Sequence, residues 1–355
     1  MKLLKLLLIF GFPIASLAQP PQTEVVEAQL PPELEFRGFL STSYSLNLAN
    51  PDSGRNGLRG YDFADRKLKL DGLNLDVRYG LDSPSQLGFR LDMVGGASYP
   101  PIDAATGLFR SAQNGQTNTA FDIRQAFVRY TFDNQLQIDA GKFATIFGYE
   151  VMPGVDGANP HGTVAYSYVY NPYTHTGLRM SYPINDELSV TGLAVLGADN
   201  FQDTNRTISL AGQVNWRPDP DFSIAVNAMV GPEQAGDTRS TRRLVDLVAN
   251  YQVAPEVNLG LHAFHREEQR LGGTGRANGI VGYLQSELAD GFWLNFRQEF
   301  VRDGAGIFFG QPVTVRSFTV SPEYRVTPDW AFRIDFRFEK ASQDVFLSRG
   351  RPSNY

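Results

Sequence analysis

The sequence predicts an all-β protein, a transmembrane antiparallel up-and-down β-barrel of about 16 strands. Three observations predict this fold. Apolar residues recur at every second position in many segments, short turns alternate with longer polar connections, and an export signal precedes the first segment. After that signal no stretch is apolar enough to cross a bilayer as a helix, which takes roughly 20 consecutive apolar residues.

Segment 330–339 shows the alternation most clearly. It reads WAFRIDFRFE, so its even-numbered positions are all aromatic or aliphatic and its odd-numbered positions after Ala331 are all charged. Successive side chains of a strand point to opposite sides, which gives this segment one apolar face and one charged face. A helix would scatter the same charges around its surface. We therefore predict a strand here.

Fifteen segments are predicted as strands on this pattern. They are 34–48, 68–81, 86–98, 120–132, 135–146, 174–182, 187–197, 206–217, 221–231, 242–252, 256–266, 278–288, 291–302, 314–326 and 329–340.

Short turns and longer polar connections alternate between the predicted strands. The turns contain Pro, Asp, Asn and Gly, which supply the backbone conformations of tight turns; they lie at 82–84, 133–134, 183–186, 218–221, 254–255, 290–291 and 327–329. The longer connections lie near 50–67, 99–119, 144–175, 198–206, 232–241, 267–278 and 303–312. Lipid offers no hydrogen bonds, so a sheet crosses a bilayer only as a closed barrel. Short turns on one side and long loops on the other are typical of outer-membrane barrels.

Aromatic residues at strand ends beside the short turns are typical of a membrane-interface girdle. They are Tyr79, Tyr130, Phe132, Tyr182, Trp216, Phe222, Tyr251, Phe292, Tyr324 and Trp330. Aromatic residues favour strands in any protein. The evidence for a girdle is therefore their clustering beside one class of turn.

The strand count is odd, whereas bacterial single-chain barrels have an even number of strands. Segment 341–355 does not alternate, and Pro352 does not suit a central strand. We therefore expect a sixteenth strand to be missing from this sequence. The alternative is a wrongly divided segment, at 68–81 or within 144–175.

Residues 1–18 predict a cleaved secretory signal peptide. Lys2 and Lys5 precede an apolar run, and small residues lie at Ser16 and Ala18. The run is too short for a membrane anchor, and the absence of cysteine excludes a lipid-anchored lipoprotein. The expected organisation is a signal peptide at 1–18, a periplasmic N-terminal segment at 19–33 and an outer-membrane β-barrel at 34–355, located in the bacterial outer membrane. The net charge of −6 argues against a nucleic-acid partner.

One block of motifs resembles a known family. Residues 139–143 read DAGKF, 147–151 read FGYEV and 171–179 read NPYTHTGLR, with Asn159 between them. This block resembles the signature of the OmpL-like β-barrel porin family, and matches at 38–44, 212–218, 231–233 and 297–304 extend the resemblance over most of the chain. The resemblance implies an outer-membrane porin. Family members usually close with a strand that ends in an aromatic residue, and the residues before Tyr355 depart from that pattern.

The sequence offers little for catalysis or metal binding. None of the four histidines forms a metal-ligand pair on one face, and there is no HExxH motif. His175 is the one candidate base, and a role in orienting its loop is the simpler interpretation. The loop with Asp52, Asn56, Asp62 and Asp65 matches no calcium-loop spacing. We predict no enzymatic activity, no catalytic residue, no metal and no cofactor.

The alternation predicts which charged residues line the lumen. They are Arg37, Arg90, Asp92, Arg129, Asp139, Arg297, Glu299, Arg333, Asp335, Arg337 and Glu339. Charged rings of this kind keep water in a pore and set its ion preference. The alternative is that these residues merely pair with one another inside a narrow barrel.

The longest connection, 144–175, is the candidate constriction loop. Glu150, Asp156, Asn159 and His161 are its candidate constriction residues, expected to face the arginines of the opposite wall. Its tyrosines (Tyr166, Tyr168, Tyr170 and Tyr173) could form a sugar-stacking surface or pack the loop, and we favour packing.

These observations predict passive diffusion of small hydrophilic solutes or ions through a water-filled lumen. The alternative is a structural or receptor-type outer-membrane barrel with a blocked lumen. A soluble, secreted all-β protein is disfavoured by the unbroken apolar rows. The expected partners are outer-membrane lipid and the permeating solutes, with a homotrimer as a possible assembly.

Overall fold

The computed structural model describes residues 33–99, 120–270, 273–348 and 351–354. The predicted signal peptide, most of segment 19–33 and nearly all of connection 99–119 lie outside these residues.

The described chain is an antiparallel sheet in which each strand pairs with the next. The strands are β1 (Leu34–Ser45), β2 (Lys67–Tyr79), β3 (Gln86–Gly95), β4 (Phe121–Thr131), β5 (Gln137–Ala144), β6 (Thr174–Pro183), β7 (Leu188–Val195), β8 (Ser209–Asp219), β9 (Phe222–Pro232), β10 (Thr241–Ala254), β11 (Val257–Arg270), β12 (Gly273–Ala289), β13 (Phe292–Asp303), β14 (Val313–Thr327), β15 (Trp330–Arg333) and β16 (Phe336–Ala341). A 3-10 helix, η1 (Tyr166–Tyr170), lies between β5 and β6, and β17 (Phe346–Ser348) pairs with β18 (Arg351–Ser353). All fifteen predicted strand segments are confirmed.

The last predicted segment, 329–340, is interrupted in the structure. β15 and β16 both pair with β14, so they are two parts of one strand broken at 334–335. Pro322 of β14 stands opposite Ile334 and has no backbone N–H, so only the bond from the Ile334 N–H to the Pro322 carbonyl, at 3.1 Å, forms at this point of the ladder. On the inward face at the break, the Asp335 carboxylate accepts hydrogen bonds from the backbone N–H and the hydroxyl of Thr163 at 2.7 and 2.9 Å. The break therefore follows from a proline in the neighbouring strand.

One predicted connection is wrong. Segment 267–278 was expected to be a loop, but β11 continues to Arg270 and β12 begins at Gly273. Glu267 stands opposite Arg276 in the register, and their side chains form an ion pair of 2.7 Å. Oppositely charged cross-strand pairs stabilise a sheet in water as apolar pairs do in lipid, so this polar hairpin extends both strands past the apolar band.

The two faces of the sheet reverse the arrangement of a soluble protein. Large apolar side chains such as Leu68 and Phe332 are 79% and 69% exposed, whereas Asp246 and Asn295 are fully buried. Apolar residues outside and polar residues inside are expected of a sheet that faces lipid. No helix in the described ranges is long and apolar enough to cross a bilayer.

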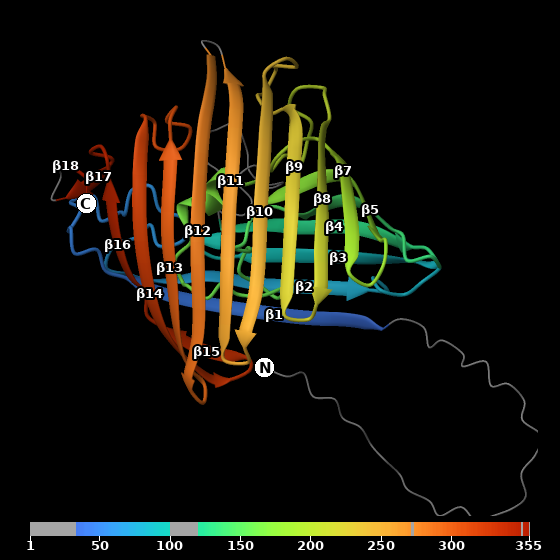
Figure 1. Cartoon of the computed structure of the whole chain (residues 1–355), viewed down its shortest axis with the longest axis horizontal. Coiled ribbons are helices and arrows are strands. Elements are labelled where there is room, and N and C mark those ends of the chain that lie inside the picture. Colours follow the sequence, from blue (N-terminus) through green and yellow to red (C-terminus); the bar gives the residue numbers. More distant parts are fainter. Residues whose placement is uncertain (1–32, 100–119, 271–272, 349–350, 355) are drawn as a thin grey trace, which may run out of the picture.

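The sheet curls so that β2–β4 and β10–β13 form opposite walls, with the connection from β5 to β6 between them (Figure 1). Within the described residues, no strand pairing joins β1 to β15 or β16. Loop contacts cross this gap, among them an ion pair of 2.8 Å between Arg59 and Glu339. The sixteenth strand expected from the sequence stays a prediction.

Candidate functional site: the lumen and the loop that crosses it

Segment 145–173, which links β5 to β6, folds into the lumen and contacts both walls. We call it the inner loop. Glycine on the wall makes room for it: a Cβ on Gly260 of β11 would lie 2.4 Å from the Tyr149 ring. Tyr149 in turn stacks on Tyr283 of β12, with ring centroids 4.0 Å apart and an angle of 13° between the planes. The start of the inner loop is thus packed against β11 and β12.

A buried ion pair fixes the inner loop to the wall formed by β10–β16. The Glu150 carboxylate and the Arg297 guanidinium are 2.7 Å apart, and their side chains are 1% and 0% exposed. The second Glu150 oxygen accepts the Ala165 backbone N–H at 2.7 Å, and Arg297 also donates to the Thr163 carbonyl at 2.7 Å. Such further hydrogen bonds offset part of the cost of burying an ion pair.

Helix η1 extends this attachment. The Ser167 backbone N–H donates to the Glu299 carboxylate at 3.0 Å, and the Tyr170 hydroxyl donates to Asp303 at 2.9 Å. Tyr166, Tyr168 and Tyr170 are all buried. These three tyrosines pack the inner loop, as we favoured from the sequence, and do not form an open stacking surface.

The tip of the inner loop reaches the opposite wall. The Asp156 carboxylate is 2.6 Å from the Arg90 guanidinium and also pairs with Arg78. Next to it, the Val155 backbone N–H donates to Asn74 at 3.1 Å. Partial burial alone would raise the pKa of Asp156, but Arg90 and Arg78 outweigh that effect and hold the pKa below its ordinary value. The inner loop therefore spans the lumen between charged anchors on both walls.

Beside the tip, two arginines share one carboxylate. Arg129 of β4 and Arg179 of β6 each lie 2.6 Å from Asp139 of β5. The arginine side chains are 16% and 14% exposed, whereas the carboxylate is 2% exposed. This part of the wall therefore presents guanidinium groups to the lumen. The Asp156 side chain, on the inner loop, is 44% exposed.

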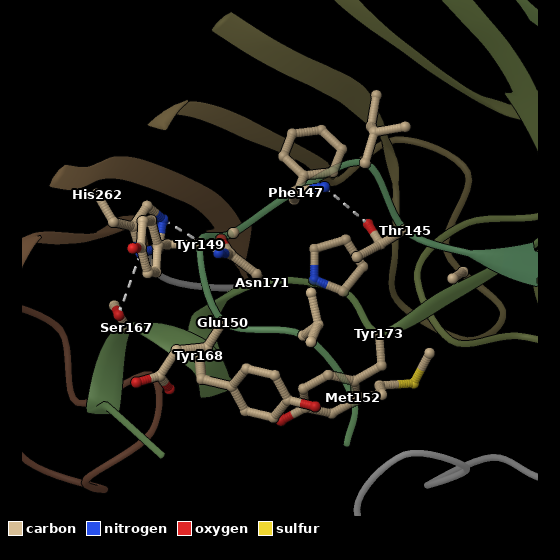
Figure 2. Close-up of a pocket in the computed structure, with 15 residues that line it drawn as sticks. Thr145, Phe147, Tyr149, Glu150, Met152, Ser167, Tyr168, Asn171, Tyr173 and His262 are labelled. Carbon is tan, nitrogen blue, oxygen red and sulfur yellow. Dashed lines mark hydrogen bonds between the residues drawn. The ribbon is translucent and has the colours of Figure 1, made fainter. Parts of the chain in front are cut away.

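The inner loop leaves a small and a larger cavity. A cavity of about 120 Å³ lies within the loop itself, lined by Met152, Tyr173 and His262 among others (Figure 2). A cavity of about 340 Å³ lies at the end of the lumen next to the short turns, lined by Arg217, Trp293 and other residues. The smaller cavity is bounded largely by residues of the inner loop itself, from Thr145 to Tyr173.

The predicted lumen residues divide into two groups by their contacts. Arg297, Glu299 and Arg337 are buried under the inner loop, and Arg337 donates to the Val164 carbonyl. The others are less covered and pair along the walls, with the inner loop or with the connection between β1 and β2: Arg37 with Glu35, Arg90 with Asp76 and Asp156, Asp92 with Gln125, Arg129 with Asp139, Arg333 with Glu323, Asp335 with Thr163, and Glu339 with Arg59.

Two of the four predicted constriction residues meet arginines of the walls, Glu150 and Asp156. Asn159 instead turns back into the loop, where its side chain bonds both the N–H and the carbonyl of Val151 at 2.8 Å. His161 lies 2.7 Å from the Ser321 hydroxyl. Burial lowers the pKa of His161 well below its ordinary value, and the nearby Arg297, Arg333 and Arg337 lower it further.

The sequence analysis missed several partners in this site. Arg78, Arg179 and Asp246 face the lumen and contact the inner loop or its neighbours; for example, Asp246 accepts the Gly148 backbone N–H at 3.2 Å. The alternation that singled out Arg90 and Arg129 applies equally to these three residues and could have found them. The described ranges hold no group of three or more side chains that could bind a metal ion.

The comparisons agree with this geometry. The model of the family described as "Putative beta-barrel porin-2, OmpL-like" matches residues 33–354. An anion-selective porin from Comamonas acidovorans has a TM-score of 0.61 at 11% identity, over 90% of this chain and 93% of that one. Salmonella typhi OmpF in complex with daunomycin has a TM-score of 0.59 at 12% identity, over 88% and 92%. Vibrio cholerae OmpT in its trimer form has a TM-score of 0.58 at 11% identity, over 92% and 94%. No curated protein matches the chain. At these identities the solved structures show a shared fold.

Proposed function

The chain belongs to the OmpL-like β-barrel porin-2 family, which makes it an outer-membrane porin for passive diffusion, and we propose that small hydrophilic solutes and ions pass through an eyelet bounded by the inner loop. Family and fold are those of a channel. The observation that carries the proposal is that the inner loop is held at both walls, by Glu150 on Arg297 and by Asp156 on Arg90.

In this proposal the charged lumen residues have two roles. Arg129 and Arg179, with Asp156 on the inner loop, border the path of the solute and influence its charge preference. Arg297, Glu299 and Arg337 hold the inner loop in place. Glu150 and His161 act in the same way from the loop side, and Asn159 stiffens the loop.

A second candidate function is a structural or receptor-type barrel with a blocked lumen. The complete burial of Arg297 and Glu299 beneath the inner loop favours it. The two candidates differ in conductance. We expect the purified protein, shown to be folded by heat-modifiable gel mobility, to give discrete ohmic current steps in a planar bilayer. A folded protein that gives a silent bilayer would exclude the porin proposal and support the blocked barrel.

Deleting 152–170 tests the eyelet itself. We expect a larger single-channel conductance, because the deletion removes the part of the chain that crosses the lumen. Shortening connection 235–239, which has no printed contact with the inner loop, is the control and should leave the conductance unchanged. An unchanged conductance after the deletion of 152–170 would show that the inner loop does not limit the current.

We further propose export by a signal peptide cleaved after Ala18, conduction of ions as well as neutral solutes, and assembly as a homotrimer. The trimer form of the OmpT structure supports the last point by similarity of fold. N-terminal sequencing of the mature protein and light scattering in detergent measure cleavage and assembly.

A further inference from the structure

Basic residues gather on the outward face of β10–β16, at the end of these strands next to the long connections. They are Arg243, His265, Arg276, Arg302, Arg316 and Lys340, and we call them the basic belt. Each shares its strand face with exposed apolar residues two or more positions away, such as Val245, Phe318 and Phe338. The side chains of Arg243 and Arg276 are 63% and 64% exposed. The basic belt therefore lies directly beside the apolar, lipid-facing band.

The basic belt is poor in compensating acid. Glu267 is 2.7 Å from Arg276, 3.5 Å from His265 and 3.9 Å from Arg243, so one carboxylate serves three belt residues. Among the residues that the structure describes, Arg302 and Arg316 have no carboxylate partner, and the Arg316 guanidinium lies 5.8 Å from the centroid of the Phe300 ring. At Arg302 and Arg316 the belt thus carries positive charge that no described carboxylate neutralises.

The belt is confined to one end and one side of the sheet. At the opposite end of the same strands the outward residues are Tyr251, Phe292, Tyr324 and Trp330. On the other half of the barrel, the outward strand positions of β3–β9 near the long connections carry no Arg or Lys; they include Met93, Ile123, Thr176, Ala194, Leu210 and Val230. A general need for solubility would spread the cations around the rim, so their confinement points to a particular ligand.

The position of the belt in the membrane indicates which kind of ligand it can bind. An arginine on the lipid face costs several kcal/mol at the bilayer centre but little at the interface, so the belt lies at the level of the headgroups. In an outer-membrane barrel the long connections are extracellular, which places the belt in the outer leaflet, where the lipids are phosphorylated glycolipids. Guanidinium groups bind phosphate through paired, charge-assisted hydrogen bonds. Resting on the outer-membrane assignment, we propose that the basic belt binds the phosphate groups of an outer-leaflet glycolipid.

Lipid A is the probe for this proposal. Its binding to the full-length mature protein in neutral-detergent micelles can be measured by titration calorimetry, with native mass spectrometry to count bound molecules. We expect the double variant R302Q/R316Q to bind about 30-fold more weakly, from about fivefold for each arginine near an anionic surface. The matched control is R206Q/R239Q, which removes the same charge from exposed positions in the long connections and should bind like the wild type.

Three outcomes would overturn the proposal. They are equal binding by R302Q/R316Q and the wild type, equal binding of lipid A and its dephosphorylated form, and arginine-dependent binding of inorganic phosphate alone. R302Q/R316Q should keep the wild-type conductance because both side chains face outward. Lost conductance of the wild type with intact lipid binding would reject the porin role alone, and intact conductance with no lipid binding would reject the basic belt alone.

Discussion

Glu150 and Arg297 form an ion pair of 2.7 Å that is almost completely buried, although 147 residues separate them in the chain. Glu150 belongs to the inner loop and Arg297 to the wall strand β13. The pair is the point at which the segment that crosses the lumen is fixed to the barrel. Its burial makes it a structural anchor, and the charges exposed to the lumen lie elsewhere, on Asp156, Arg129 and Arg179.

Breaking this anchor should destabilise the protein. E150Q leaves the buried Arg297 guanidinium without its counter-charge, which costs about 3–5 kcal/mol in comparable buried pairs. We expect a lower temperature for the heat-modifiable mobility shift and noisier single-channel current. E35Q, which breaks the exposed Glu35–Arg37 pair, is the control and should cost about 1 kcal/mol or less. Equal shifts for the two variants would show that the buried pair is no anchor.

The Asp156 carboxylate should influence ion selectivity. D156N removes an exposed negative charge and leaves Arg78 and Arg90 without this partner, so the reversal potential in a salt gradient should move toward anions. The effect should shrink in 1 M salt, where the Debye length is about 3 Å. D237N, in a long connection outside the lumen, should leave the reversal potential unchanged. A shift toward cations in D156N would contradict the proposed placement of these charges.

Val151 should be reachable from the lumen. Its side chain is 45% exposed although it belongs to the inner loop, and the chain has no cysteine, so V151C introduces a single thiol. We expect a negatively charged methanethiosulfonate reagent to reduce the single-channel current of V151C stepwise. T238C, on a long connection, should react without a change in current. If reaction of V151C left the current unchanged, the path would not pass the inner loop.

His161 should remain neutral well below the ordinary histidine pKa. Its folded-state pKa is lowered by burial and by three arginines, so its contribution to stability is present above about pH 6.5 and is lost as the pH falls from there through the lowered folded pKa. Nitrogen-15 histidine NMR in micelles, with H161Q to identify the signal, should show an imidazole that titrates far below pH 6.5. Titration near 6.5 would mean that the imidazole is not buried beside the arginines.

Much of the fold could be predicted from the sequence because the information is local. The two-residue alternation marks strands and their faces without knowledge of the partners, and it located all fifteen segments. It failed at 267–278, where polar residues in a long hairpin have the composition of a loop and only the pairing of Glu267 with Arg276 shows a strand. It also could not foresee the break in 329–340, which depends on the pairing of Ile334 with Pro322 of the neighbouring strand.

The candidate site likewise has features that could be predicted from the sequence and features that could not. The sequence by itself determined that Arg129 and Arg297 point inward, because the direction of a side chain depends on its own strand. Only the tertiary structure decided that Arg129 remains at the edge of the lumen and that Arg297 is buried under Glu150. That difference depends on the path of the inner loop, which is set by contacts with strands more than a hundred residues away in the chain. The alternation shows to which side of its strand a residue points. Its burial and its charge partner depend on which distant segment covers it.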